Sequence, residues 1–253
     1  MHLQKSWALQ LLAGLLCASA TVSATPTPTP STAPAPQNET QPQTIQGIDL
    51  FEVHLPVAWK AAVANGVEFL FVKATEGIAY RNLRYPLQTL HASSSAPSVL
   101  RGAIHFALPS QSTGRHQADF FIEHGGNWTA DGLTLPGVLE MEGNIPGKLC
   151  HGMTPLEITD WMMDFSNRYK EVTGRVPALF LSEGWWAKCA GGNETFGLEH
   201  PLWLANWADE MGALPRGWEE ARFWQYSGLS RFGGEANVFF GGREELVEFA
   251  LGV

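Results

Sequence analysis

The sequence predicts an α/β barrel in which the last helices are reduced or missing. Over the first five units, short apolar runs typical of buried strands alternate with stretches typical of helices. This alternation implies parallel strands that are covered by helices. Two further strand-like runs, at 202–205 and 223–226, leave little room for full helices between them. In such barrels the chemistry lies at the carboxyl ends of the strands.

The N-terminus has the pattern of a secretory signal peptide. Lys5 precedes an apolar stretch from Trp7 to Ala20, and the small residues Val22-Ser23-Ala24 form a cleavage site. We therefore expect residues 1–24 to be removed and the protein to be secreted to the extracellular space. The apolar stretch is short for a bilayer and no later segment is long and apolar enough, so no membrane partner is expected.

Residues 25–45 are predicted to form a linker, and 46–253 a single barrel domain. The linker is dominated by Pro and Thr and has almost no large apolar residues, a composition that stays extended. The domain is long enough to bury a sizeable core.

Charge and cysteine usage narrow the class of partner. The chain has a formal net charge of −9, which argues against nucleic acid as a partner. Of its three cysteines, Cys17 leaves with the signal peptide. The remaining pair, Cys150 and Cys189, is most simply one disulfide in an oxidising compartment, with two separate buried thiols as the alternative. We expect a monomer.

Local signals place the individual elements. Helices are predicted at 56–65, at 114–124, and from the capping box Thr154-Pro155-Leu156-Glu157 up to Gly174. The apolar stripe of this last helix is interpreted as core; it consists of Ile158, Trp161, Met162, Phe165 and Tyr169. Strands are predicted at 45–50, 69–72, 100–106, 137–142 and 176–181, besides the two at 202–205 and 223–226.

Glu140 and Glu142 form an acidic pair at the end of the predicted strand 137–142. Residues at i and i+2 of a strand face the same side, so the two carboxyl groups share one face, roughly 6–7 Å apart at the backbone. Like charges at this distance raise one pKa, so one group can hold a proton while the other is ionised. A glycosidic bond is cut with this pair of groups, although two solvated acids at a strand end are the simpler interpretation of the spacing alone.

Several short motifs resemble those of glycoside hydrolase family 25, the Ch-type lysozymes. They occur in the family's order from about Gln46 to the C-terminus. The matching pieces are Gly47-Ile48-Asp49, Phe71 to Gly77 (FVKATEG), Arg101-Gly102-Ala103, His105-Phe106-Ala107, Leu135 to Leu139 (LPGVL), Met141-Glu142, Trp185-Trp186 and Phe223 to Ser227 (FWQYS). The positions of Cys150 and Cys189 also resemble the single disulfide of secreted members.

The resemblance implies a flattened, TIM-like barrel of about eight strands of the (β/α)5(β)3 type. It also implies cleavage of the β-1,4 bond between N-acetylmuramic acid and N-acetylglucosamine in peptidoglycan, without a cofactor. Glu142 would be the general acid, Glu140 would take the place of an Asp that orients the N-acetyl group, and Asp49 matches the acid on the first strand.

The chain departs from the family pattern at several site positions. A Ser-His-Trp-like sequence is replaced by Leu50 to His54 (LFEVH), and two tyrosines by Ile104 and Phe180. Near the C-terminus the family's acid becomes Ala236 or Asn237, or is replaced by Glu235. With one acid gone the pKa of Glu142 should rise less, and a displaced carboxylate can cost about 100-fold in rate.

Two functions are therefore weighed: a secreted muramidase, and a glycan-binding protein on the same barrel that has lost hydrolysis. A modified or chitin-like glycan is a third possibility for the substrate. Trp203, Trp207 and Trp224 are candidates for lining a sugar groove, while His105 and Glu76 are expected to support the site. The sequence has no metal-ligand spacing and no phosphate-binding loop, and we expect neither metal nor cofactor.

Overall fold

A computed structural model of the protein describes residues 43–143 and 148–253. The predicted signal peptide and nearly all of the predicted linker lie outside the described residues. The first strand, β1 (Thr44–Leu50), begins at the last two positions that were assigned to the linker. No helix in the described part of the chain has the length and apolarity to cross a membrane.

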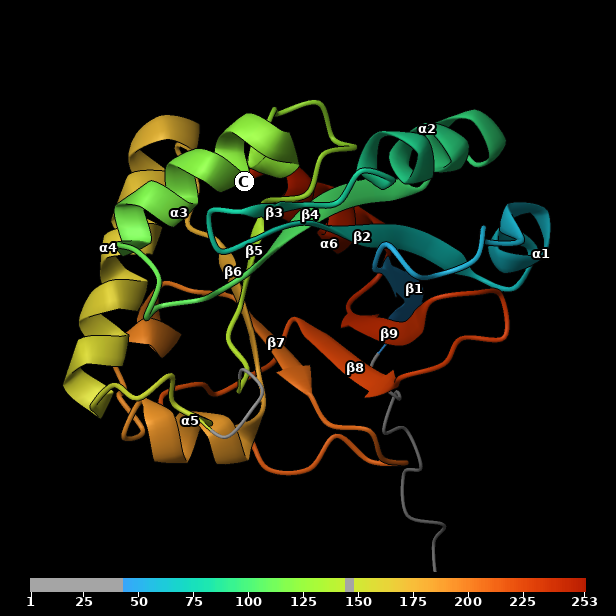
Figure 1. The fold of residues 1–253 in the computed structure, drawn as a ribbon. Helices are drawn as coiled ribbons and strands as arrows, with labels where there is room; N and C mark the ends of the chain where they lie inside the picture. Colours follow the sequence, from blue (N-terminus) through green and yellow to red (C-terminus); the bar gives the residue numbers. More distant parts are fainter. Residues whose placement is uncertain (1–42, 144–147) are drawn as a thin grey trace, which may run out of the picture. The chain divides into compact units, whose positions relative to one another are not determined.

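Within the described residues, eight strands close into a barrel (Figure 1). The parallel strands are β1, β2 (Val67–Glu76), β4 (Leu100–Phe106), β5 (Val138–Glu140), β6 (Ala178–Leu181), β7 (Leu202–Ala205) and β8 (Phe223–Ser227). The last strand, β9 (Glu235–Phe240), runs antiparallel between β8 and β1 and closes the ring. A two-residue strand, β3 (Tyr80–Arg81), pairs antiparallel with the end of β2 and forms a hairpin with it.

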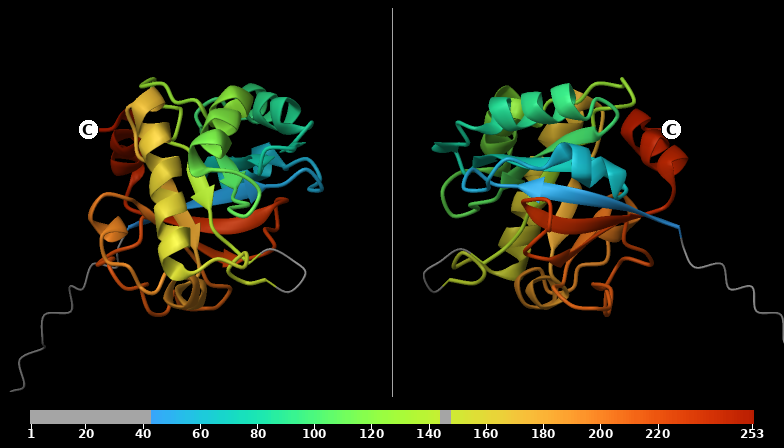
Figure 2. Two further views of the ribbon diagram at one scale, coloured as in Figure 1. Left: turned by 60° about the vertical axis from the view of Figure 1, so that its left-hand side comes forward. Right: turned by 90° about the vertical axis from the view of Figure 1, so that its right-hand side faces the viewer.

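The connections confirm the predicted fold class. The helices α1 (Trp59–Ala64), α2 (Tyr85–Ser95), α3 (Gly114–Phe121), α4 (Pro155–Thr173) and α5 (Glu183–Cys189) each follow one of the first five barrel strands. No helix longer than a single turn separates β7, β8 and β9 in the described chain, and α6 (Arg243–Leu251) follows the last strand. Figure 2 shows α3 and α4 packed side by side against one wall of the barrel.

Most elements were predicted, with shifted bounds. The capping box of α4 is present: Thr154 Oγ1 accepts from the Glu157 amide and the Glu157 carboxylate accepts from the Thr154 amide. Helix α1 begins at Trp59 rather than Pro56, because the Ala58 amide donates to Phe232 of a neighbouring loop. The helix predicted at 114–124 changes at Ile122 into a π-helical turn, Ile122–Gly126.

The elements α2, α5, β9 and α6 and the two-residue strand β3 were not predicted. Helix α2 buries only Ala92, and its leucines Leu87 and Leu90 face solvent. It therefore lacks the apolar stripe by which a helix is recognised in a sequence.

The core is divided by the barrel wall. Alternating residues of the strands point inward, and the inner cluster is dominated by large aromatic side chains: Phe69, Phe71, Phe180, Trp203, Phe223 and Phe239. The outward residues pack under the helices, where the predicted stripe of α4 is buried as expected.

Glycine makes room for the rings inside the barrel. A Cβ on Gly102 would come within 2.2 Å of the Phe71 ring, and Phe71 is itself held against Trp203 at a centroid distance of 4.8 Å. The ring therefore has no space into which it could move.

Gly102→Ala is expected to lower the free energy of unfolding by about 1–3 kcal/mol, because overpacking forces neighbouring side chains to shift. Gly184→Ala is the matched control: it lies in α5 with nothing within 4 Å of an added Cβ, and should be neutral or stabilising by up to about 1 kcal/mol. Urea unfolding of both variants measures the difference; equal effects would contradict the packing argument.

Candidate active site

Within the described residues, the inward-facing polar side chains of the strands gather at one end of the barrel. This end is formed by the carboxyl ends of the parallel strands, and the register Asp49↔Glu235 brings the start of antiparallel β9 to the same end. The inward-facing polar residues here are Asp49, Lys73, Glu140, Gln225, Glu235 and Asn237. They lie above the aromatic cluster, so several carboxyl groups share a partly dehydrated site.

The acidic pair on β5 has the geometry that its spacing predicts. Val138 belongs to the inner cluster while Leu139 and Met141 pack outside, so Glu140 points into the barrel. Glu140 is 4% exposed, and its Oε2 has no hydrogen-bond partner among residues 43–143 and 148–253. Burial, followed by the charge of Glu142, raises the pKa of Glu140 well above its usual value.

Glu142 lies two residues further on, just beyond the end of the strand, and is partly exposed. Burial raises the pKa of its carboxyl group, the ammonium group of Lys73 opposes this shift, and the charge of Asp49 adds to it. Glu142 thus combines a tendency to hold a proton with access to solvent.

The segment after Glu142 is tied back to it. His151 Nε2 donates to the Glu142 carbonyl at 2.9 Å, from a left-handed backbone conformation with φ of 56°. The adjacent Cys150 forms a disulfide with Cys189 at the end of α5, as predicted, so the alternative of two separate thiols was wrong.

Asp49 and Glu235 form a second acidic pair. Gln225 Nε2 donates to Asp49 Oδ1 at 3.0 Å and to Glu235 Oε2 at 2.7 Å, and Asn237 Nδ2 donates to Asp49 Oδ1 at 2.7 Å. Burial raises the pKa of Asp49 although these hydrogen bonds oppose it. Burial, followed by the charge of Asp49, raises the pKa of Glu235 to about 8, so Glu235 holds the proton of the pair at neutral pH.

Two tryptophans fix the direction of the amides that hold this pair. Trp203 Nε1 donates to Asn237 Oδ1 at 3.0 Å, and Trp207 Nε1 donates to Gln225 Oε1 at 2.8 Å. An indole N–H can only donate, so each amide must present its oxygen to the indole and its NH₂ group to the carboxylates.

Lys73 is a cation inside this acidic site. Its Nζ lies 2.6 Å from Glu76 Oε2 and 4.3 Å from the centroid of the Phe106 ring. It favours the ionised forms of Glu140 and Glu142, and so limits the rise of their pKa values.

The structure brings most of the predicted residues together. Asp49, Glu140, Glu142 and Glu235 share the mouth of the barrel, and Glu76 reaches it through Lys73. Of the three positions considered for the acid near the C-terminus, the one whose carboxyl group lies beside Asp49 is Glu235, while Asn237 contributes its amide.

The other predicted residues lie elsewhere. His105 is fully buried outside the barrel wall, bonded to Thr75 and Gln117, and burial lowers its pKa to about 4. Trp203 is fully buried within the barrel, and Trp224 Nε1 donates to a loop carbonyl.

Trp207 is the member of the predicted trio with an exposed ring, at 65% exposure. The ring lies against Gly228, where an added Cβ would come within 2.8 Å of it. Beside it is a hollow of about 530 Å³ lined by residues 207–209 and 226–229.

Three contributors were not singled out from the sequence: Lys73, His151 and Gln225. Two of them stand inside quoted motifs, Lys73 in FVKATEG and Gln225 in FWQYS. The period-2 alternation of β2 and β8 could have found both, because each follows inward-facing aromatic residues at a spacing of two.

Comparison with known proteins gives consistent matches. The model of glycosyl hydrolases family 25 matches residues 48–235. An N,O-diacetylmuramidase of Arthroderma benhamiae is 37% identical over 214 residues, which are 85% of this chain and 90% of that protein. An N,O-diacetylmuramidase of Chalaropsis sp is 38% identical over 211 residues, 83% of this chain and 100% of that protein.

The fold of the chain is also similar to that of a solved muramidase structure. The muramidase from Acremonium alcalophilum superposes with a TM-score of 0.80 at 36% identity, over 83% of this chain and 100% of that one. The chain belongs to glycosyl hydrolases family 25.

Proposed function

We propose that the protein is a secreted muramidase that hydrolyses the β-1,4 bond between N-acetylmuramic acid and N-acetylglucosamine in peptidoglycan. The observation that carries this proposal is the position of Glu142: a partly exposed carboxyl group with a raised pKa, at the mouth of a barrel that belongs to this family. The names of the relatives, diacetylmuramidase and muramidase, support the same substrate.

In this proposal Glu142 is the general acid. A neutral carboxyl group at the mouth can donate its proton to the glycosidic oxygen as the bond to the sugar breaks, which typically contributes 10²–10⁴-fold to the rate. The carbonyl hydrogen bond from His151 holds the backbone of Glu142, and positioning of this kind governs how well a proton donor is aligned.

The other carboxyl groups shape the site around this acid. Glu140 is buried close to Glu142, and its Oε2 has no hydrogen-bond partner among the described residues. Asp49 is the ionised partner of Glu235, and its negative charge opposes ionisation of Glu142. A negative charge here also stabilises the positive charge that develops on the sugar.

Trp207 is proposed to stack on a sugar ring. Its exposed ring is held in place by Gln225 and by Gly228, and such amphipathic rings suit the apolar faces of sugars. The proposed extracellular location rests on the signal-peptide pattern of residues 1–24, and the disulfide suits an oxidising compartment.

Glu142→Gln should reduce hydrolysis of purified bacterial peptidoglycan by at least about 100-fold, because the amide has no proton to donate. Mass spectrometry of the soluble fragments measures this: wild-type protein should release fragments that end in reducing N-acetylmuramic acid. Glu219→Gln, an exposed substitution just before β8 and away from the mouth, is the matched control. A folded wild-type protein that binds the glycan without releasing fragments would support the binding-protein alternative instead.

Glu140→Gln should stabilise the fold increasingly as pH rises. In the unfolded chain Glu140 ionises near its usual pKa, whereas the folded protein keeps it protonated to higher pH. The folded state then binds more protons, so the wild type loses stability above about pH 4.5, at up to about 1.4 kcal/mol per pH unit for one proton. Urea unfolding at pH 4, 6 and 8 should show that the difference between the free energies of unfolding of the two proteins grows as the pH rises. A difference that stays constant with pH would contradict burial of a neutral carboxyl group.

Trp207→Phe and Trp207→Ala should separate two roles of this side chain. Phe keeps a stacking surface but cannot donate to Gln225, so its main effect should be a shifted pH profile of kcat/KM. Ala also removes the stacking surface, and should raise KM by about tenfold or more. Kinetics across pH with both variants tests this; a pH profile unchanged in Trp207→Phe would exclude the link through Gln225.

A further inference from the structure

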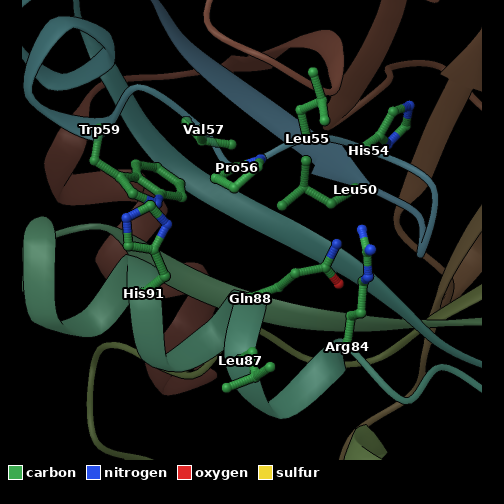
Figure 3. A pocket seen from close by; sticks show the side chains of 10 residues that line it. All are labelled: Leu50, His54, Leu55, Pro56, Val57, Trp59, Arg84, Leu87, Gln88 and His91. Atoms are coloured by element: carbon green, nitrogen blue, oxygen red, sulfur yellow. The ribbon is translucent and has the colours of Figure 1, made fainter.

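A second hollow, of about 590 Å³, lies outside the barrel wall, between the connection that follows β1 and helix α2 (Figure 3). Its walls are mainly apolar and include Leu50, Leu55, Val57, Trp59 and Leu87. None of these residues contributes to the acidic site described above.

The apolar wall is open to solvent. Leu55 is 77% exposed and Leu87 is 67% exposed, although both are large aliphatic side chains. Leu55 belongs to the connection that follows β1 and Leu87 belongs to α2, so the exposed apolar surface of the hollow is built from two different elements. Concave apolar surface of this kind is typical of a ligand site.

One end of the hollow is polar and includes the side chains of His54 and Arg84, with the Gln88 amide beside them. Figure 3 shows His54 and Arg84 at this end, with Trp59 and His91 at the other. Arg84 Nη1 donates to the Glu52 carbonyl at 3.2 Å, but Arg84 has no ion pair among the described residues, since the Glu52 carboxylate accepts from Tyr80. An unpaired guanidinium group is notable in a protein with a net charge of −9.

His54 adds a second donor. Its Nδ1 accepts from the Phe51 amide at 2.9 Å, so the neutral ring carries its proton on Nε2. Burial keeps the ring neutral by lowering its pKa. Besides the hydrogen bond from Arg84 Nη1 to the Glu52 carbonyl, the guanidinium group of Arg84 and Nε2 of His54 offer further donors to the hollow, which suits a carboxylate.

The polar end is also the end nearest to the acidic site. Leu50 lines the hollow and directly follows Asp49 on β1, with the two side chains on opposite sides of the barrel wall. His54 is close enough to Asp49 for the charge of Asp49 to affect its pKa. A substrate that is bound at the mouth could therefore extend a substituent over the connection 51–55 into the hollow.

We propose that this hollow binds the short peptide that N-acetylmuramic acid carries in peptidoglycan, with a peptide carboxylate at Arg84 and His54 and alanine methyl groups against Leu55, Val57 and Leu87. The inference rests on the proposed function, because the same sugar carries both the bond to be cleaved and the peptide. That peptide combines small apolar residues with carboxylates, which matches a hollow with apolar walls and donors at one end.

Direct binding of the free peptide tests the hollow independently of catalysis. The probe is the synthetic pentapeptide L-alanyl-γ-D-glutamyl-L-lysyl-D-alanyl-D-alanine, titrated into the intact domain by calorimetry. Wild-type protein should bind it, and Arg84→Gln and Leu87→Asp should each weaken binding about tenfold or more. Arg115→Gln, which removes the same charge from α3, should bind like the wild type. Absence of binding by the folded wild type would overturn the proposal.

Hydrolysis of matched glycans provides the second readout. Wild-type kcat/KM should be about tenfold higher on peptide-bearing glycan strands than on strands stripped by an amidase, and Arg84→Gln should narrow that ratio while Arg115→Gln should not. Equal turnover of the two glycans by the wild type would overturn the inference and leave the muramidase proposal intact. Peptide binding without hydrolysis of either glycan would support the hollow and contradict the muramidase proposal.

Discussion

The acidic site depends on the aromatic filling of the barrel beneath it. Phe71, Trp203 and Phe223 pack against one another inside the barrel, next to the strand ends that carry the carboxyl groups. Burial is accordingly the first cause of the raised pKa of Asp49, Glu140, Glu142 and Glu235 alike. Ile104 and Phe180 add further apolar atoms to this interior. Burial in apolar surroundings favours the protonated form of a carboxyl group, and glycoside hydrolysis requires a protonated acid.

The two glutamates Glu235 and Glu140 differ in their surroundings. Glu235 accepts a hydrogen bond from Gln225 and lies beside Asp49. Glu140 is enclosed, and one of its oxygens has no partner in the described part of the chain. An enclosed, unpartnered carboxyl group destabilises a fold, and such a cost is commonly tolerated at functional sites.

The features that were predicted correctly depend on residues close together in the sequence. The capping box of α4 follows from residue types at a fixed spacing and its buried stripe follows from helical periodicity, and the structure has both. What remained unpredicted depends on segments far apart in the chain. Gln225 and Asn237 meet because β9 pairs with β8 when the barrel closes. Leu87 of α2 lines a hollow together with residues of the connection that follows β1, which lies far from it in the sequence. His105 shows the limit of motif spacing: it lies at a strand end as predicted, but alternation turns it outward under α3 and α4.

The order in which the chain is made has a consequence for when the site exists. Asp49 lies on the first strand, and its partner Asn237 lies 188 positions later, on the strand that closes the ring. Nearly the whole domain must therefore be synthesised before the pair can form, and contacts of such long separation are also among the slowest to form in folding. An incomplete or unfolded chain would carry the general acid without its surroundings. The acidic site is therefore complete only after the last strand has joined the barrel, and any wall-degrading activity must wait for this step.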